Sequence, residues 1–441
     1  MFTGAQVSSI TGGRLNGSGT AEAFKINTDT RKISDGDLFI ALCGEKFDGN
    51  DFILQAFEKG AAICVTNRET DVPEGKAEII VKDTGKALLE LAGNYRDRFD
   101  VHLVGVTGSV GKTTTKEMIA CALEGGFKTL KTEGNFNNEI GMPHTLFRLD
   151  DTYGAAVIEM GMNHFGELSR LSKTAKPDIA VITNIGISHI ENLGSRENIL
   201  KAKLEILDGL KEGGTLILNG EDEFLRTVKS DKYKIVDYGL GDTYDICGEE
   251  ISDNIVKICG ETIKLSVEGR HNLLNACAAM AVATELGLPP AISAKSLENY
   301  RPDGIRQTTV VSPQGVTILC DWYNAAPQSV TAALGLLAKK DGRKIAVLGD
   351  MLELGHLSEQ SHRDVGKAAA QNSIDYLFTY GEKSVAIIEG AAEAGLLNAI
   401  HFSDKQKLSD YLIKFLKPGD FVLIKGSRGM KMEDVYEQIM R

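Results

Sequence analysis

The chain has fewer basic than acidic residues. Its 441 residues include 49 Lys and Arg against 61 Asp and Glu, which gives a net charge of −12 with neutral histidine. Proteins that bind nucleic acids or anionic membranes need a basic face. The imbalance argues against both classes, so a polyanionic ligand would have to be held by a local basic site.

Long apolar runs and paired cysteines are also missing. No stretch approaches the roughly 18 apolar residues of a transmembrane helix. The N-terminal MFTGAQVSSI has neither the basic start nor the apolar run of a secretory signal. The seven cysteines are scattered without a CxxC pair, which is typical of single thiols in a reducing compartment. We therefore expect a cytoplasmic protein without membrane insertion, disulfides or a cysteine-bound metal.

The length of the chain predicts several domains, because 441 residues are too many for one ordinary core. Short β-like runs and turns fill the first hundred residues. Buried-strand candidates that alternate with helical stretches then follow at 102–106, 155–160, 178–185 and 215–219. This alternation is typical of a parallel α/β sheet.

We accordingly predict an α/β fold of three domains. A small α/β domain would occupy residues 1–98, a central P-loop domain with a parallel sheet 99–305, and a Rossmann-like domain 306–441. The strands of the third domain are expected in VTILC, KIAVLGD, YLFTYG, AIHF and FVLIKG. No long linker, low-complexity tract or internal repeat interrupts the sequence.

A glycine-rich loop, TGSVGKTTT, lies between the strand candidate at 102–106 and a helical stretch. It departs from the strict pattern G-x-x-x-x-G-K-[ST] because Val106 stands at the first glycine. Backbone N–H groups at such a junction attract phosphate, Lys112 would neutralise the β- and γ-phosphates, and Thr113 would ligate Mg²⁺. The predicted nucleotide site comprises Gly108, Ser109, Gly111, Lys112, Thr113 and Thr114. A structural glycine turn is the alternative, and a P-loop alone does not distinguish a kinase, an ATPase motor and a ligase.

Two further side chains follow strand candidates of the same sheet. Glu159 ends AAVIEM, and a carboxylate at the C-terminal end of a strand beside a P-loop is well placed to bind Mg²⁺. His189 follows the next strand, in TNIGISHIENLGS. Taken singly, Glu159 could be a solvated strand-end residue, and a lone histidine is more often structural than a ligand.

Lys203 lies on the apolar face of the helical stretch 195–210. At about 100° per residue, that face comprises Ile199, Leu200, Leu204, Ile206, Leu207 and Leu210. A lysine in its middle must snorkel to solvent, pair with an acid or be chemically changed. Snorkelling is the common case. A functional lysine is the sharper hypothesis, because desolvation favours the neutral amine, which can react.

Many segments, in order and spacing, resemble the Mur ligase family, and within it the members that add D-alanyl-D-alanine. The resemblance runs nearly end to end and is carried by TDTRKISDGDLFIAL, TGSVGKTTTKEM, TEGNFNNEIGMP, EMG, TNIGISHIENLGS, KAKLEI, EGRHNLLNA, GIRQ, DWYNAAP, LGDMLELG and IKGSRGMKME. The chain departs from the family pattern at Thr30 (usually Ser), Asn50 (usually His), Ala326 (usually Asn or Ser) and Trp322, which is larger than the usual residue.

The resemblance implies an ATP-dependent ligase that activates a carboxylate as an acyl phosphate and joins it to an amine. Its substrates would be UDP-N-acetylmuramoyl-tripeptide and D-alanyl-D-alanine, in peptidoglycan biosynthesis, and we expect a monomer. Lys112 and Thr113 would hold ATP and one Mg²⁺. Glu159 and His189 would hold a second Mg²⁺ together with Lys203, which would be carbamylated by CO₂. Lys112, Lys203 and His189 would serve catalysis.

The same resemblance implies binding roles for residues outside the phosphate loop. Asn272 and Asn275 would approach the adenine, and Arg306 and Asp321 would bind ATP from the third domain. The peptide-bearing nucleotide would be bound by Thr30, Arg31, Thr132, Asn135, Asn137 and Asn138. No motif reports whether the third peptide residue is lysine or diaminopimelate.

Three other functions stay open at this point. Another amino-acid-adding Mur ligase or a folylpolyglutamate-type synthetase is the nearest, but GNFNNEIGMP is present and a DNP-type motif is absent, which argues against both. A P-loop ATPase or kinase would transfer or release phosphate without forming an amide. The third function is a nucleotide-binding protein without ligase activity, which the departure from the family pattern at Ala326 makes conceivable.

Overall fold

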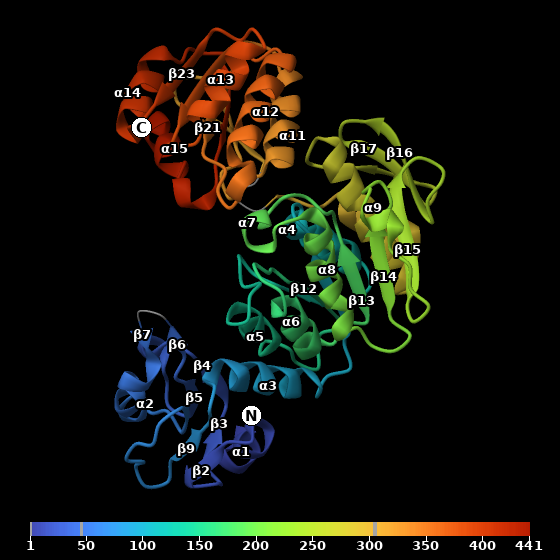
Figure 1. Cartoon of the computed structure of the whole chain (residues 1–441). Helices are drawn as coiled ribbons and strands as arrows, with labels where there is room; N and C mark the ends of the chain where they lie inside the picture. The colour runs from blue at the N-terminus through green and yellow to red at the C-terminus, as the bar shows by residue number, and fades with distance from the viewer. Residues whose placement is uncertain (1, 45–46, 303–306) are drawn as a thin grey trace.

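The computed structural model describes residues 2–44, 47–302 and 307–441, which form three α/β units in chain order (Figure 1). The N-terminal unit, in blue, and the C-terminal unit, in orange and red, flank a central unit with the largest sheet. The predicted three-domain α/β architecture is confirmed, and its exact boundaries stay predictions. Arg306 lies outside the described residues. Over the ranges that are described, no helix has the length and apolarity needed to cross a bilayer.

The N-terminal unit is built on a five-stranded mixed sheet of order β2-β9-β8-β5-β4. Its elements are β1 (Phe2–Thr3), α1 (Gly4–Thr11), β2 (Arg14–Gly17), β3 (Glu22–Ala23), β4 (Lys25–Asn27), β5 (Asp37–Ile40), β6 (Cys43–Gly44), β7 (Phe47–Asp48), α2 (Ile53–Glu58), β8 (Ile63–Thr66), β9 (Ala77–Ile80) and α3 (Thr84–Arg96). Helix α3 begins at the side-chain cap of Asp83 and ends against the central unit, where the buried Arg96 donates to the Ala175 carbonyl (2.9 Å).

The central unit contains a nine-stranded sheet of order β11-β12-β10-β13-β14-β15-β16-β17-β18. Its strands are β10 (His102–Thr107), β11 (Thr129–Lys131), β12 (Ala155–Glu159), β13 (Ile179–Ile182), β14 (Thr215–Asn219), β15 (Lys234–Leu240), β16 (Ile246–Ser252), β17 (Ile255–Ile258) and β18 (Glu261–Lys264). The predicted parallel pairing is confirmed from β11 to β16. No strands are predicted from the sequence at β16 to β18, which pair antiparallel. These last strands carry many exposed positions, so their apolar pattern in the sequence is weak.

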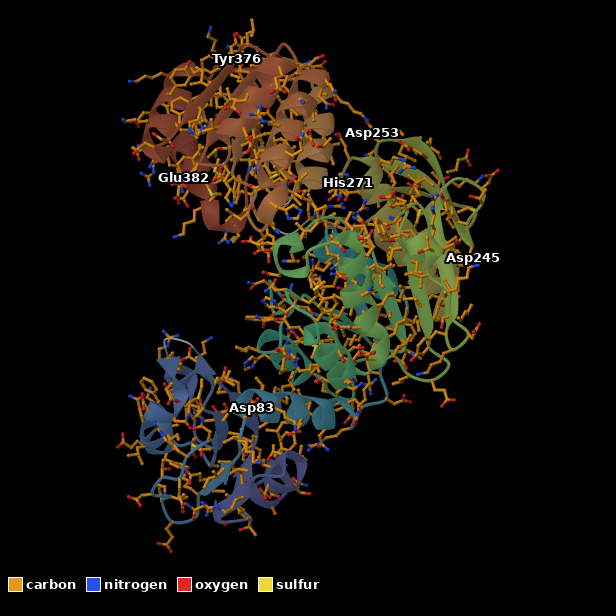
Figure 2. The ribbon with its side chains drawn as sticks, in the orientation of Figure 1. Asp83, Asp245, Asp253, His271, Tyr376 and Glu382 are labelled. Carbon is orange, nitrogen blue, oxygen red and sulfur yellow. The ribbon has the colours of Figure 1, made fainter. Side chains whose placement is uncertain are left out.

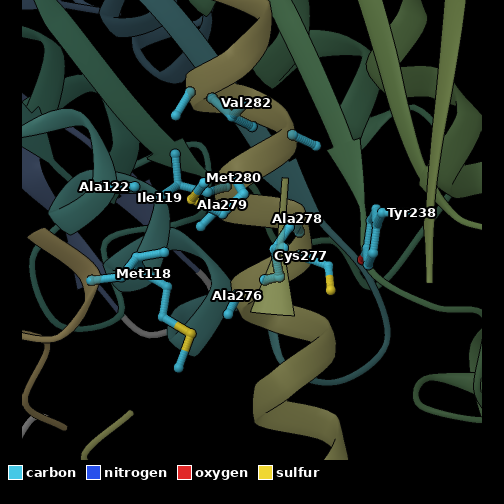
Figure 3. Close-up of a cluster of buried hydrophobic side chains, with 14 of the residues drawn as sticks. Met118, Ile119, Ala122, Tyr238, Ala276, Cys277, Ala278, Ala279, Met280 and Val282 are labelled. Atoms are coloured by element: carbon cyan, nitrogen blue, oxygen red, sulfur yellow. The ribbon is translucent and has the colours of Figure 1, made fainter. Parts of the chain in front are cut away.

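Helices cover both faces of the central sheet. They are α4 (Lys112–Leu123), α5 (Gly141–Leu146), α6 (Glu167–Ala175), α7 (Ile190–Leu193), α8 (Arg196–Leu204), α9 (Arg270–Glu285) and α10 (Pro290–Leu297). On one face α4 packs against α9 through fully buried side chains, among them Met118 and Ile119 of α4 and Ala276, Ala279 and Met280 of α9 (Figure 3). Small alanine side chains allow this close approach, and the packing holds α4 firmly behind the glycine-rich loop.

The C-terminal unit is a six-stranded sheet of order β19-β20-β24-β21-β22-β23, parallel except for β19, and the predicted Rossmann-like layering is confirmed. Its elements are β19 (Thr308–Val311), β20 (Thr317–Cys320), α11 (Pro327–Ala338), β21 (Lys344–Gly349), α12 (Ser358–Gln371), β22 (Tyr376–Tyr380), α13 (Val385–Glu393), β23 (Ala399–Phe402), α14 (Lys405–Phe415), β24 (Phe421–Lys425) and α15 (Glu433–Met440). Trp322 is 4% exposed and packs on Tyr436, with ring centroids 4.9 Å apart, so its bulk fills this core.

Candidate functional site

The glycine-rich loop connects β10 to α4, as predicted. Gly108 has φ +152°, and a Cβ there would lie 1.9 Å from the Thr183 hydroxyl, so only glycine fits. Gly111, at φ +82°, precedes the first turn of α4. The Lys112 amine donates to the Gly108 carbonyl (2.8 Å), folding back over the loop. The loop therefore presents backbone N–H groups and one cation at the C-terminal edge of a parallel sheet.

The end of β13 fixes this loop from the side. The Asn184 carboxamide accepts from Val110 N–H (3.0 Å) and donates to the Val110 carbonyl (2.9 Å). The Ser109 hydroxyl accepts from Gly186 N–H (2.8 Å). Asn184 has no role in the sequence prediction. Its position directly after a buried strand next to β10 is the signal that could have identified it.

Glu159 lies at the end of β12 and is 2% exposed. Its two carboxylate oxygens accept from the Thr113 hydroxyl and the Asn137 amide, each at 2.8 Å. Its backbone N–H donates to the Thr132 hydroxyl (3.0 Å). Among the described residues no cation forms an ion pair with Glu159, so its buried negative charge is opposed only by neutral donors. A buried carboxylate with the Thr113 hydroxyl oxygen beside it fits a hard divalent cation such as Mg²⁺.

His189 follows β13, and its ring reaches the C-terminal unit. Its Nδ1 lies 2.7 Å from Oε2 of Glu353, in the loop after β21. The contact with His189 lowers the pKa of Glu353 below its usual value, with a smaller contribution from the charge of Lys112. Glu353 lies in LGDMLELG but has no role in the sequence prediction, because no local pattern reports a partner in another domain.

Lys203 is in α8, which begins at the side-chain cap of Ser195 and passes into a 3₁₀ turn, Glu205–Asp208. The residue is 1% exposed, so the snorkelling alternative is wrong for this structure. No acid within the described residues forms an ion pair with its amine. Burial, and then the charge of Lys112, lower the pKa of Lys203 well below its usual value. The neutral, reactive form of the amine is favoured.

A chain of side-chain hydrogen bonds connects α4 with the start of the C-terminal unit. Thr115 donates to Asn275 (3.0 Å), the Asn275 amide lies 3.4 Å from the Asn272 carbonyl oxygen, and Asn272 donates to Gln307 (2.8 Å). Gln307 in turn lies 2.7 Å from His271 Nε2. Figure 2 places His271 where the central and C-terminal units meet. The two asparagines predicted to approach the adenine thus lie at this junction.

On the opposite wall, β20 and β24 of the C-terminal unit bring a buried ion pair together. The Lys425 amine is 2.5 Å from Asp321 Oδ2 and donates to the Asn324 carbonyl (3.0 Å). Lys425 is 3% exposed. It lies in IKGSRGMKME, yet no role for it follows from the sequence, because a lysine that ends a strand is ordinarily solvated.

A cleft of about 440 Å³ lies between these two walls. Of the predicted site residues, it is lined by Ser109, Gly111, Lys112, Thr113, Thr114, Asn137, Asn138, Glu159, His189, Asn272, Asn275 and Asp321. Asn184, Lys425 and Ala326 line it as well. The lining residues thus come from the phosphate loop, from Glu159 and His189 among the candidate metal ligands, and from the C-terminal unit, whereas Gly108 and the buried Lys203 do not line the cleft.

Several predicted residues lie outside the lining. Thr132 is fully buried, with its carbonyl accepting from the buried Lys116 (2.6 Å), and Asn135 is exposed. Thr30 and Arg31 lie in the N-terminal unit, where Arg31 is paired with Asp29 and its side chain is 86% exposed. The predicted peptide-nucleotide residues are therefore not gathered in one cleft here.

Comparison with known proteins extends these observations to the whole chain. Three family descriptions match it: "Mur ligase family, catalytic domain" at residues 25–96, "Mur ligase middle domain" at 106–283 and "Mur ligase, glutamate ligase domain" at 306–428. UDP-N-acetylmuramoyl-tripeptide--D-alanyl-D-alanine ligase of Bacillus subtilis is 41% identical, over 94% of this chain and 93% of the relative. The enzyme of that name from Escherichia coli is 35% identical, over 98% and 96%.

Solved structures agree with the sequence relatives. A crystal structure of MurF from Acinetobacter baumannii has a TM-score of 0.93 at 32% identity, covering 100% of this chain and 98% of that one. MurF ligase from Thermotoga maritima, in complex with ADP, has a TM-score of 0.85 at 29% identity, covering 95% and 97%. Because this identity extends over nearly the full length of both chains and all three units, the chain belongs to the Mur ligase family.

Proposed function

We propose that this chain uses ATP to join D-alanyl-D-alanine to UDP-N-acetylmuramoyl-tripeptide in peptidoglycan synthesis. The observation that carries the proposal is the cleft, in which the phosphate loop, the buried Glu159 and the Asp321–Lys425 pair face one another. Full-length relatives of 35–41% identity with that named activity support the choice of substrates.

The loop and the third-domain wall would bind ATP between them. Backbone N–H groups at the start of α4 and the Lys112 amine would hold the phosphates. Asn272 and Asn275 would contact the adenine. Asp321 would bind ATP from the C-terminal unit, and so would Arg306, which lies outside the residues that the structure describes. Thr113 and Glu159 would hold Mg²⁺, which, when bound, offsets the phosphate charge.

Two bond-forming steps would complete the reaction. A carboxylate oxygen of the tripeptide attacks the γ-phosphorus, the bond to the β-phosphate oxygen breaks, and ADP leaves with that electron pair. The amine of D-alanyl-D-alanine then attacks the acyl carbon, and phosphate leaves as the amine loses its proton. At about 4 Å two unit charges repel by about 4 kcal/mol at an effective dielectric of 20, so Lys112 would lower the barrier to the first step by offsetting the negative charge.

Carbamylation of Lys203 is part of the proposal. A neutral lysine amine adds CO₂ and releases a proton, which leaves a carboxylate-like group. The complete burial of Lys203 and its lowered pKa favour that neutral amine. With Glu159 and His189, the new carboxylate would supply a further ligand for a second Mg²⁺. Carbon-13-labelled CO₂ should give a carbamate NMR signal in the native chain that is absent in Lys203→Met.

The function is tested by incubating the chain with ATP, D-alanyl-D-alanine and UDP-N-acetylmuramoyl-tripeptides that carry either lysine or diaminopimelate. Mass spectrometry should show the pentapeptide product, with ADP and phosphate formed only when both substrates are present. Phosphate release without an amine acceptor would favour a P-loop ATPase. Ligation of a single amino acid in place of the dipeptide would favour a sister ligase.

A further inference from the structure

The loop that carries His189 and the loop after β21 touch across the boundary between the central and C-terminal units. The contact joins His189 Nδ1 to Glu353 Oε2 at 2.7 Å. Close by, Gly355 lies against Glu191, and a Cβ on Gly355 would be 3.1 Å from the Glu191 Cα. The two loops therefore fit together over several residues around this one polar pair.

Both residues of the pair have an unusual backbone. His189 and Glu353 each have φ +64°, in the left-handed region that few non-glycine residues adopt. Such conformations persist where the surroundings hold them, and they concentrate at functional sites. Two of them meeting at one interdomain contact indicate that the ring and the carboxylate are held in a defined geometry.

The contact also selects which ring nitrogen of His189 is available. Carboxylates that accept from one imidazole nitrogen fix the tautomer and leave the other nitrogen with its lone pair. Nδ1 is buried 2.7 Å from Glu353 Oε2 but lacks an aligned hydrogen bond in this structure, so a hydrogen bond completed on closure would leave Nε2 to act as an acceptor or ligand. Over the described ranges Nε2 has no hydrogen-bond partner of its own, and His189 lines the cleft.

We propose that Glu353 is a positioning residue which, when the C-terminal unit closes on the central unit, fixes the His189 ring with Nε2 directed to a divalent cation in the cleft. The inference rests on the proposed ligase function and adds to it a coupling between domain closure and the completion of the cation site. It assigns a role to a third-domain residue that does not itself touch the substrates.

The test compares Glu353→Gln and Glu353→Ala with Glu382→Gln. Glu382 is an exposed glutamate elsewhere on the C-terminal unit (Figure 2), and its substitution serves as the matched control. The Glu353 side chain is 57% exposed, so its variants should fold, and thermal unfolding checks this. Mn²⁺ binding to the full chain is titrated by electron paramagnetic resonance, with Glu159→Gln identifying the relevant site.

The Glu353 variants should bind Mn²⁺ roughly tenfold more weakly at the site that Glu159→Gln removes. The loss of a carboxylate behind a histidine ligand has an effect of this size in other proteins. Backbone hydrogen exchange should rise in residues 187–194. The ligation kcat should fall by a similar factor, while the KM for ATP stays nearly constant. If Mn²⁺ affinity and hydrogen exchange do not change, the contact is only a surface ion pair. If Mn²⁺ binds more tightly to the variants, Glu353 competes with the cation for His189. Either result overturns the proposal.

The experiments distinguish a wrong ligase assignment from a wrong positioning role for Glu353. If the native chain does not ligate D-alanyl-D-alanine but the Glu353 variants still weaken Mn²⁺ and raise exchange, the substrate assignment fails and the positioning role stands. If ligation proceeds and the Glu353 variants behave like Glu382→Gln, the positioning role alone is rejected.

Discussion

The nucleotide side of this molecule and its predicted peptide side differ in how completely they are assembled. Around the glycine-rich loop, Glu159, Thr113 and Asn184 are connected by short hydrogen bonds to buried strands and helices. In the N-terminal unit, Arg31 has only Asp29 as an ion-pair partner among the described residues, and its side chain is largely exposed. One side thus has the geometry of a preformed site, and the other does not.

This difference indicates where binding requires movement. A preformed phosphate site loses little conformational freedom when ATP binds. The peptide-bearing nucleotide would have to bridge from Arg31 to the cleft near Asn138, and these residues lie on different units. Closure of the N-terminal unit by its substrate, and of the C-terminal unit by ATP, is the expected consequence.

The largest expected effect is on the preformed side. Lys112→Ala should lower ligation by about a thousandfold, because one charged donor to the transferred phosphate is lost from a dry site. Circular dichroism should show an intact fold. The control is Lys201→Ala, because Lys201 is an exposed lysine of α8. Near-native ligation by folded Lys112→Ala would remove the phosphate loop from the mechanism.

Lys203→Ala should lower ligation by about a hundredfold, since a ligand of the second cation would be lost. A short-chain carboxylate in solution should restore part of the rate by occupying the vacated space. Native-like activity of Lys203→Met in CO₂-free buffer would reject the carbamate. Lys201→Ala serves as the control here too, because it removes a lysine from the opposite face of the same helix.

The lowered pKa of Lys203 also predicts that the stability of the fold depends on pH in CO₂-free buffer. Its pKa is lowered in the folded state, so between that pKa and the unfolded value of about 10.4 the unfolded chain binds more protons. Stability should therefore increase with pH through this window. Lys203→Met should reduce the slope of the unfolding free energy against pH, measured by denaturant titration. An identical slope in the two proteins would contradict the lowered pKa.

On the peptide side a smaller effect is expected. Arg31→Ala should raise the KM for UDP-N-acetylmuramoyl-tripeptide by roughly tenfold, since one charge-assisted hydrogen bond is worth about 1.5–3 kcal/mol and the exposed site lies at the low end. The KM for ATP should not change. Arg14→Ala is the matched control, because Arg14 is an exposed arginine of the same unit that is likewise paired with an acid. An equal rise in both variants would indicate a general charge effect.

The smallest signal is the change in shape. Small-angle scattering should show a lower radius of gyration when an ATP analogue and the peptide-bearing nucleotide are both present than with either alone. The reason is that each ligand would close a different unit. A radius that stays constant under all conditions would contradict closure and remove the distinction between a preformed and an assembled side.

Local sequence predicted the junction of strand, glycine loop and helix correctly because its parts are close in sequence. A strand, a glycine loop and a helix form one contiguous junction, so TGSVGKTTT predicted the place of Lys112 and Thr113 in the cleft. The apolar stripe of α8 likewise predicted that Lys203 lies on the apolar face, since side-chain periodicity on a helix is a local property, but it left open whether the amine reaches solvent. The antiparallel strands β16 to β18 were not predicted, because their half-exposed residues leave little apolar contrast.

Patterns and motifs along the chain were enough to predict the three α/β units, the glycine-rich loop and the family to which the chain belongs. Only the tertiary structure brought Asn184 to the loop, Lys425 to Asp321 and Glu353 to His189. These pairs are formed by residues that are 74, 104 and 164 positions apart in the chain. Sheet order and domain packing decide such contacts, and no local pattern of hydrophobicity or charge encodes them.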